Sequence, residues 1–128
     1  MSDVVKVSAN SKLGLGFSRA VRVGNMVFVS GCVGVDPATN SMVKGGVREQ
    51  TKQTLDNIKA ILESAGSSLD KVLKVTVYIK EGSYFKDMNE VYAQCFGAHK
   101  PARATVVVGF VKDDIVVEID AVATTATQ

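Results

Sequence analysis

The chain has 128 residues, 46% hydrophobic and 22% charged, which is typical of one globular domain covering residues 1–128. The net charge of +2, with Lys and Arg spread along the whole chain, does not favour nucleic acid as a partner. No window approaches the roughly 18 continuous apolar residues of a membrane span, and the N-terminus shows no secretory signal. We therefore expect a cytoplasmic protein that does not bind a membrane.

Strand-like segments occupy the first third of the chain. Gly24-Asn25 predicts a tight turn between two of them, as in a β-hairpin. Asp36 to Asn40 is rich in turn-forming residues and predicts a loop. The expected strands are Val4–Ser8, Phe17–Val23 and Met26–Ser30.

The middle of the chain changes to a helical period. Apolar residues recur every three or four positions from Val47 to Ala65, and Gly66 is the expected C-terminal cap. Val72 to Ile79 predicts a buried strand. A second helix is expected after Ser83, a candidate N-cap, and it ends at Gly97. The apolar stripe of this helix consists of Phe85, Met88, Val91, Tyr92, Cys95 and Phe96.

Two further strands close the chain, Arg103 to Phe110 and Ile115 to Thr124. Strands and helices are mixed without strict alternation, which predicts an α+β fold. Two helices on one face of the sheet would leave the other face bare. Because Val106-Val107-Val108 and Ile115-Val116-Val117 are apolar on both faces, that second face needs a cover. Another copy of the chain would provide it, so we expect a homo-oligomer.

Arg103 stands out because it lies at the start of a strongly apolar strand. Strand alternation places Arg103, Thr105 and Val107 on one face. A guanidinium is costly to bury without a partner, and its planar fork fits a carboxylate. Spacing alone leaves two interpretations open. Arg103 either binds an anionic ligand, or it reaches solvent or pairs with an acid of its own chain.

Glu118 is an acid inside an apolar strand. If the last two strands form a hairpin whose loop is centred between Val111 and Lys112, Thr105 lies opposite Glu118 and Arg103 lies diagonal to it. Glu118 then either neutralises Arg103 or orients a water beside an anion that Arg103 holds. The sequence does not separate these two interpretations.

The remaining polar candidates carry weaker signals. Ser30-Gly31 ends an apolar strand, where backbone N–H groups could bind a ligand oxygen, although a plain turn explains the pair as well. His99 is the single histidine and has no neighbouring acid or cysteine in sequence. Cys32 and Cys95 are far apart and are expected to be reduced core thiols, with a disulfide or a reactive thiol as the alternative. No metal motif or phosphate loop is visible, and we expect no cofactor.

Several blocks of the sequence resemble RidA/YjgF proteins, in order and over about Phe17 to Ala123. The C-terminal blocks are the family's signature, so the match is specific. The resemblance implies a chorismate-mutase-like fold, with a mixed six-stranded sheet and two helices on one face, assembled as a homotrimer with clefts between subunits. The blocks are Gly24–Gly31, Thr54–Ala60, Lys74–Ile79, Pro101–Thr105 and Val117–Ala123.

The resemblance also implies a function. The best-known family members are hydrolases that deaminate reactive 2-imino acids and enamines, such as 2-iminobutanoate and 2-iminopropanoate, to 2-keto acids and ammonia without a cofactor. The ligand would be a small carboxylate. Two alternatives remain, a carboxylate-binding protein without turnover and an endoribonuclease L-PSP or translation inhibitor, a label that some members carry.

Residue by residue, the resemblance makes Arg103 the clamp for the substrate carboxylate, Glu118 the group that orients water, and Gly31, beside Ser30, a backbone contact. Two positions depart from many active deaminases, which have tyrosine where Phe17 stands and often cysteine where Thr105 stands.

A neighbouring subunit is implied to wall the cleft near three residues of the second helix. These are Phe85, Met88 and Asn89.

Overall fold

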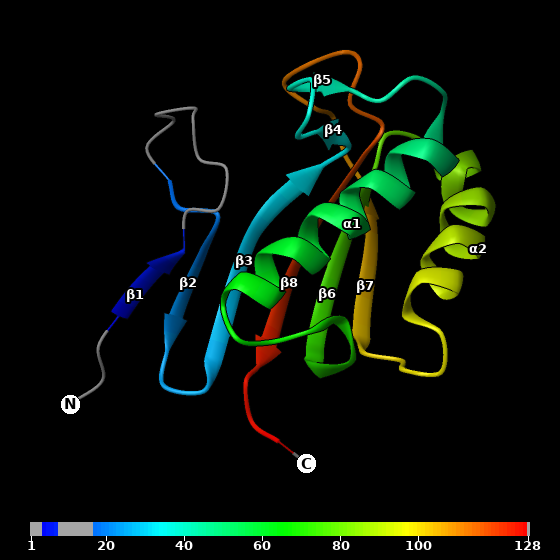
Figure 1. Cartoon of the computed structure of the whole chain (residues 1–128). Coiled ribbons are helices and arrows are strands. Elements are labelled where there is room, and N and C mark those ends of the chain that lie inside the picture. The colour runs from blue at the N-terminus through cyan, green and yellow to red at the C-terminus, as the bar shows by residue number, and fades with distance from the viewer. Residues whose placement is uncertain (1–3, 8–16, 128) are drawn as a thin grey trace.

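The computed structural model describes residues 4–7 and 17–127, and it has two layers (Figure 1). Two α-helices, α1 (Val47–Ser64) and α2 (Phe85–Phe96), pack on the same face of a six-stranded mixed sheet. The predicted α+β architecture is therefore confirmed. The strands of the sheet are β1 (Val4–Val7), β2 (Ala20–Val23), β3 (Met26–Val33), β6 (Val72–Ile79), β7 (Ala102–Val107) and β8 (Val117–Thr124).

The first half of the chain follows the sequence prediction closely. Strands β2 and β3 pair antiparallel across the Gly24-Asn25 turn, where Gly24 has φ +56°. Strand β2 begins only at Ala20, so Phe17 and Arg19 precede it rather than belonging to it. The predicted loop from Asp36 to Asn40 is the turn of a small separate ribbon. Its strands are β4 (Val35–Asp36) and β5 (Ser41–Met42).

The second half of the chain differs from the sequence prediction at the start of one helix. Strand β6 covers the predicted residues, and α1 ends one residue before the predicted Ala65, at Ser64. The prediction that Ser83 caps α2 is wrong, because a single 3₁₀ turn, Gly82–Tyr84, precedes the helix and places Tyr84 at the cap position. Helix α2 ends at Gly97, which has φ +64°, as expected.

The order of the strands overturns the predicted hairpin between the last two. The sheet order is β1-β2-β3-β8-β6-β7, so β6 separates β7 from β8. Strand β7 pairs parallel with β6, because helix α2 carries the chain back to the same end of the sheet. Strand β8 pairs antiparallel with both β3 and β6. This central position buries every second residue of β8 against the helices.

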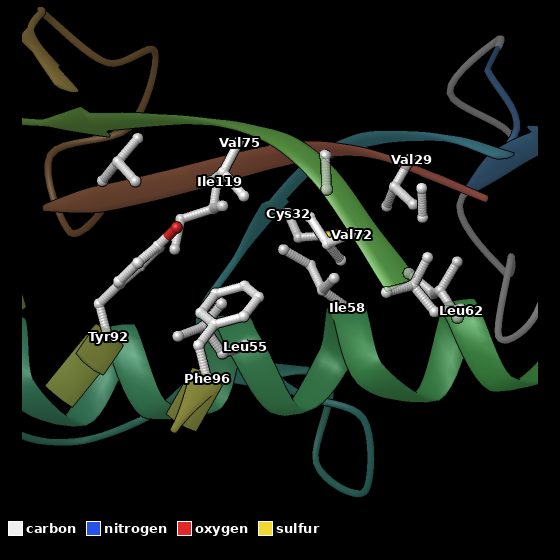
Figure 2. Close-up of a cluster of buried hydrophobic side chains, with 14 of the residues drawn as sticks. Val29, Cys32, Leu55, Ile58, Leu62, Val72, Val75, Tyr92, Phe96 and Ile119 are labelled. Carbon is white, nitrogen blue, oxygen red and sulfur yellow. The ribbon is translucent and has the colours of Figure 1, made fainter. Parts of the chain in front are cut away.

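The core lies between the sheet and the two helices (Figure 2). Helix α1 directs Leu55, Ile58 and Leu62, all at most 1% exposed, toward the strands. Strands β6 and β8 face them with completely buried residues. These are Val72, Val75, Val77, Val117, Ile119 and Ala123.

The opposite face of the sheet is bare in the single chain. Phe28 of β3 is 46% exposed and Val106 of β7 is 42% exposed, and both point away from the helices. Nothing in the described part of the chain covers this outer face (Figure 1). The expectation of two helices on one face and an uncovered second face is confirmed.

Two expectations about the chain's environment can be compared with the described residues. Among them no helix is long and apolar enough to cross a bilayer. Cys32, which is buried, and Cys95, which is half-buried, are both free thiols. Burial raises the pKa of the Cys32 thiol to about 12, so Cys32 is an inert core residue.

Gln50 on α1 ties the chain to the start of β8. Its side chain is 4% exposed, its Nε2 donates to the carbonyl of Asp114 at 2.7 Å, and its Oε1 accepts from the N–H of Val116 at 3.0 Å. Both halves of the amide are therefore satisfied inside the protein, and they fix the residues that lead to Glu118.

We predict that Gln50→Ala lowers the free energy of unfolding by about 1–3 kcal/mol, because it removes two hydrogen bonds of a buried side chain and leaves a part-buried N–H and a part-buried carbonyl without them. Urea denaturation measures the change. The control is Gln53→Ala, which removes only a hydrogen bond to Asn57 one turn along the same helix and is expected to cost about 0.5 kcal/mol or less. Equal losses in the two variants would contradict this account of Gln50.

Candidate functional site

Arg103 lies near the start of β7, on the face of the sheet that carries the helices. It is the register partner of the buried Val75 in β6. Its Nη1 donates to Oδ1 of Asn89 at 2.7 Å. Its Cζ lies 4.6 Å from the centroid of the Tyr92 ring and 5.6 Å from that of Phe85. Helix α2 therefore supplies all three contacts.

No acid of the described residues lies within ion-pair distance of Arg103. Of the open interpretations, pairing with an acid of the same chain is thus wrong for the part of the chain that is described. The guanidinium is half-buried and keeps most of its N–H donors available. This geometry fits the binding of an anion.

Two buried hydroxyls lie on the same layer as Arg103. Thr105 follows Arg103 by two residues on the same face of β7, and its Oγ1 is buried. The hydroxyl of Tyr92 is also buried, and among the described residues neither oxygen has a hydrogen-bond partner. Unsatisfied buried hydroxyls are costly, so they are typical of positions that a ligand or water completes. We call Phe85, Asn89, Tyr92, Arg103 and Thr105 the arginine half-site.

Glu118 lies on the other face of the sheet. It is the register partner of Tyr78 in β6 and of Val33 in β3, between the inward-facing Val117 and Ile119. Its pKa is raised, first by partial burial and then by the nearby charge of Asp120. A carboxyl with a raised pKa exchanges protons closer to neutral pH, as acid–base catalysis requires.

Ser30 and Gly31 lie beside Glu118 in an irregular stretch of β3. The register with β8 shifts between Val29 and Cys32, so neither Ser30 nor Gly31 has a partner in β8. A side chain at position 31 would overlap the Glu118 carboxylate. The glycine therefore allows the Glu118 carboxylate to lie close to the backbone of β3, while the predicted backbone contact of Gly31 to a ligand stays a prediction.

Phe17 lies one residue before a backbone group that contacts Ser30. The hydroxyl of Ser30 donates to the carbonyl of Ser18 at 2.6 Å, which holds the residue after Phe17 against the irregular stretch of β3. The ring of Phe17 is 53% exposed. We call Phe17, Ser30, Gly31 and Glu118 the glutamate half-site.

The two half-sites are separated in the single chain. Arg103 and Glu118 lie on opposite faces of the sheet, on strands that β6 keeps apart. The predicted pairing of Thr105 with Glu118 is therefore wrong, and Glu118 does not neutralise the Arg103 of its own chain. One small molecule cannot contact both side chains of one chain.

The structure places the three residues of α2 differently from one another. Phe85, 41% exposed, and Asn89 contact Arg103, but Met88 is completely buried in the core. Sequence reasoning missed Tyr92, which it assigned only to the apolar stripe. Its position three residues after Asn89 was the available signal, because such residues share a helix face.

Two further possibilities, a role for His99 and a metal site, have no support among the described residues. Nε2 of His99 is hydrogen-bonded to the carbonyl of Val72 at 2.7 Å, a structural contact. Among the described residues no group of three or more His, Cys, Asp or Glu could hold a metal ion.

The two-layer fold with a bare sheet face defines the class of protein, a small chorismate-mutase-like α+β domain. Comparison with known sequences narrows the class. The family model described as endoribonuclease L-PSP matches residues 11–125. The chain belongs to the RidA/YjgF family.

Individual relatives and solved structures are similar to the chain over most of their length. A RutC family protein of Pyrococcus abyssi is 50% identical over 107 residues, covering 84% of each chain. The 2-iminobutanoate/2-iminopropanoate deaminase of Homo sapiens is 39% identical over 107 residues, which are 84% of this chain and 78% of the human one. The crystal structure of RidA from an Antarctic Psychrobacter is similar with a TM-score of 0.87 at 36% identity, covering 94% of this chain and 98% of that one. The YjgF gene product of E. coli gives 0.88 at 31% identity, covering 95% and 99%.

We predict that Gly31→Ala lowers the free energy of unfolding by about 1 kcal/mol, the low end for overpacking, because the new methyl group displaces the flexible end of the Glu118 side chain. Adding Glu118→Ala should restore most of that loss, since the truncated side chain leaves room for the methyl group. A double-mutant cycle by urea denaturation measures this coupling. Strictly additive losses would contradict the contact.

Proposed function

We propose that the chain hydrolyses reactive 2-imino acids, such as 2-iminobutanoate and 2-iminopropanoate, to 2-keto acids and ammonia. The observation that carries the proposal is Arg103, a guanidinium that α2 holds in place while no described acid of its own chain pairs with it. Such a fork is suited to the substrate carboxylate. Human and mite relatives bear the name of this deaminase.

In the proposed reaction Arg103 fixes the carboxylate and Glu118 directs a water molecule to the imine carbon. Water adds across the C=N bond, and the resulting tetrahedral adduct expels ammonia as the C=O bond forms. Glu118 moves the two protons of the water to the nitrogen in turn, the first as water adds and the second, from the hydroxyl of the adduct, as ammonia leaves, a role that its raised pKa favours. Imines hydrolyse unaided, so positioning supplies much of the required acceleration and no cofactor is needed.

We further propose that each site is composite, with Arg103 from one chain and Glu118 from a neighbour. The support is geometric, because the two side chains lie on opposite faces of one sheet. The bare outer face, with Phe28 46% exposed, is the surface on which copies would pack. We propose the homotrimer of the family resemblance, with sites in the clefts between subunits.

The other classes of function have less support. The arginine half-site contains one cation, and Asp120 adds a second acid beside Glu118, which is unfavourable for RNA phosphates. A carboxylate-binding protein without turnover is the stronger alternative, favoured by Phe17, which brings no hydroxyl to the glutamate half-site. The free thiols Cys32 and Cys95 fit the reducing cytoplasm as the proposed location.

We predict that Arg103→Ala lowers kcat/KM for 2-iminobutanoate, generated in a coupled assay, by about 100-fold or more, because the carboxylate loses its charged partner. Arg103→Lys keeps the charge but not the planar fork, and it should recover only part of the activity.

The control for these variants is Arg48→Ala. Arg48 is an exposed arginine that pairs with Asp87 and Glu90, and its removal should leave the rate unchanged. Full activity in Arg103→Ala would refute the clamp. Saturable binding of 2-oxobutanoate by a wild-type protein without a deaminase rate would support the binding protein instead.

A further inference from the structure

Helix α2 forms a cradle around the Arg103 guanidinium. Phe85, Asn89 and Tyr92 are spaced four and three residues apart, so they share one face of the helix. The two rings attract the cation through their faces, at 5.6 Å for Phe85 and 4.6 Å for Tyr92. Asn89 supplies a directional contact, a hydrogen bond of 2.7 Å.

All three contacts hold the guanidinium without neutralising it. The amide oxygen of Asn89 is uncharged, and an aromatic face occupies no N–H donor. A carboxylate at position 89 would form a stronger, charge-assisted bond to the same nitrogen of Arg103. The cradle thus fixes the orientation of Arg103 and leaves its charge available.

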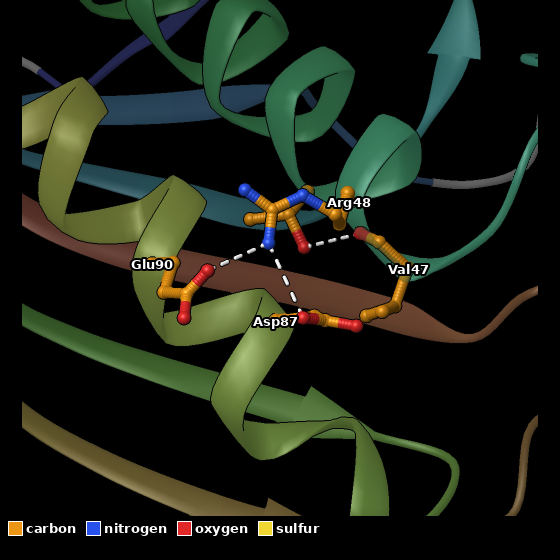
Figure 3. A network of polar contacts seen from close by, with 5 residues as sticks. Val47, Arg48, Asp87 and Glu90 are labelled. Carbon is orange, nitrogen blue, oxygen red and sulfur yellow. Dashed lines mark hydrogen bonds and ion pairs between the residues drawn. The ribbon is translucent and has the colours of Figure 1, made fainter.

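The same helix contacts a second arginine, Arg48, through acidic side chains that neutralise its charge (Figure 3). Arg48 of α1 donates to Asp87 at 3.2 Å and to Glu90 at 2.8 Å. Asp87 and Glu90 flank Asn89 closely in sequence, yet they point to Arg48 on another face of α2. Acids therefore occur on α2 where an arginine is neutralised, and an amide occurs where an arginine is left charged.

We infer that Asn89 is a positioning residue whose neutral amide aims the Arg103 fork at a ligand carboxylate while leaving the positive charge for that ligand. The inference rests on the proposed function, since it says how the same arginine recognises its substrate class. Binding of the ligand then requires that residue 89 be uncharged. Alignment of the Arg103 guanidinium requires the hydrogen bond from Arg103 to the amide oxygen.

Asn89→Asp tests this requirement because aspartate has nearly the shape of asparagine and accepts the same hydrogen bond. The new carboxylate pairs with Arg103 and competes with the ligand. Calorimetry should therefore show that the affinity for 2-oxobutanoate falls by at least about 30-fold. The matched control is Gln94→Glu, which adds the same charge at an exposed position of α2 and should bind as wild type does. Asn89→Ala, which removes the hydrogen bond without adding charge, should weaken binding about tenfold.

A stability measurement separates this inference from the proposed function. Arg103 lowers the pKa of a carboxyl at position 89, so the pair stabilises the fold above the unfolded-state pKa of about 3.9 and loses that effect as the pH falls below it. The Tm of Asn89→Asp should therefore exceed that of wild type at pH 7, and the difference should shrink steadily as the pH falls below about 3.9.

The outcomes are distinct. If wild type binds 2-oxobutanoate and either Asn89→Asp or Asn89→Ala binds it equally well, the inference is overturned and the proposed function stands. If wild type binds no 2-oxobutanoate and turns over no imine, the proposed function fails. In that case the Tm comparison still tests whether the Arg103 charge is left unneutralised. A higher Tm of Asn89→Asp at pH 7 supports an unneutralised charge, and an unchanged Tm contradicts it.

Discussion

The position of β6 between β7 and β8 is the constraint on which the rest of the structure depends. Because α2 returns the chain for parallel pairing of β7 with β6, β8 occupies the gap between β3 and β6. Arg103 then faces the helices near one edge of the sheet, and Glu118 faces outward from its centre. A chain that carries both groups needed for the proposed reaction keeps them apart.

That separation connects assembly with chemistry. The outer face leaves Phe28 and Val106 exposed, which is unfavourable for a solitary chain. The glutamate half-site lies on this same face, and β7, which carries Arg103, is an edge strand of the sheet. The proposed composite site requires that the copy covering the face approach Glu118 with this edge. Two local features support this arrangement. Gln50 fixes the start of β8, and Gly31 leaves room for the Glu118 carboxylate.

The sequence predicted what depends on neighbours along the chain. The period of Val47 to Ala65 gave α1 to within one residue, the apolar run gave β6, and Gly24-Asn25 gave the hairpin of β2 and β3. Alternation correctly placed Arg103 and Thr105 on one face of β7. These properties follow from local periodicity and turn chemistry, which a single sequence contains.

The order of strands was not predictable in this way. Alternation says which residues of a strand share a face, but it does not say which strand lies alongside. The assumed hairpin therefore put Glu118 beside Thr105, although Tyr78 is its actual partner. The cradle of Asn89 and Tyr92 was missed for a similar reason, because it depends on how α2 packs over β7.

Subunit complementation tests the composite site most directly. Arg103→Ala and Glu118→Gln chains, each inactive alone, are unfolded together in equal amounts and refolded into mixed oligomers. If Arg103 and Glu118 act across an interface, about a quarter of the sites combine an intact arginine with an intact glutamate, and that fraction of wild-type activity returns. If both residues of a site come from one chain, no mixed site is intact, and a mixture that stays inactive would contradict the account.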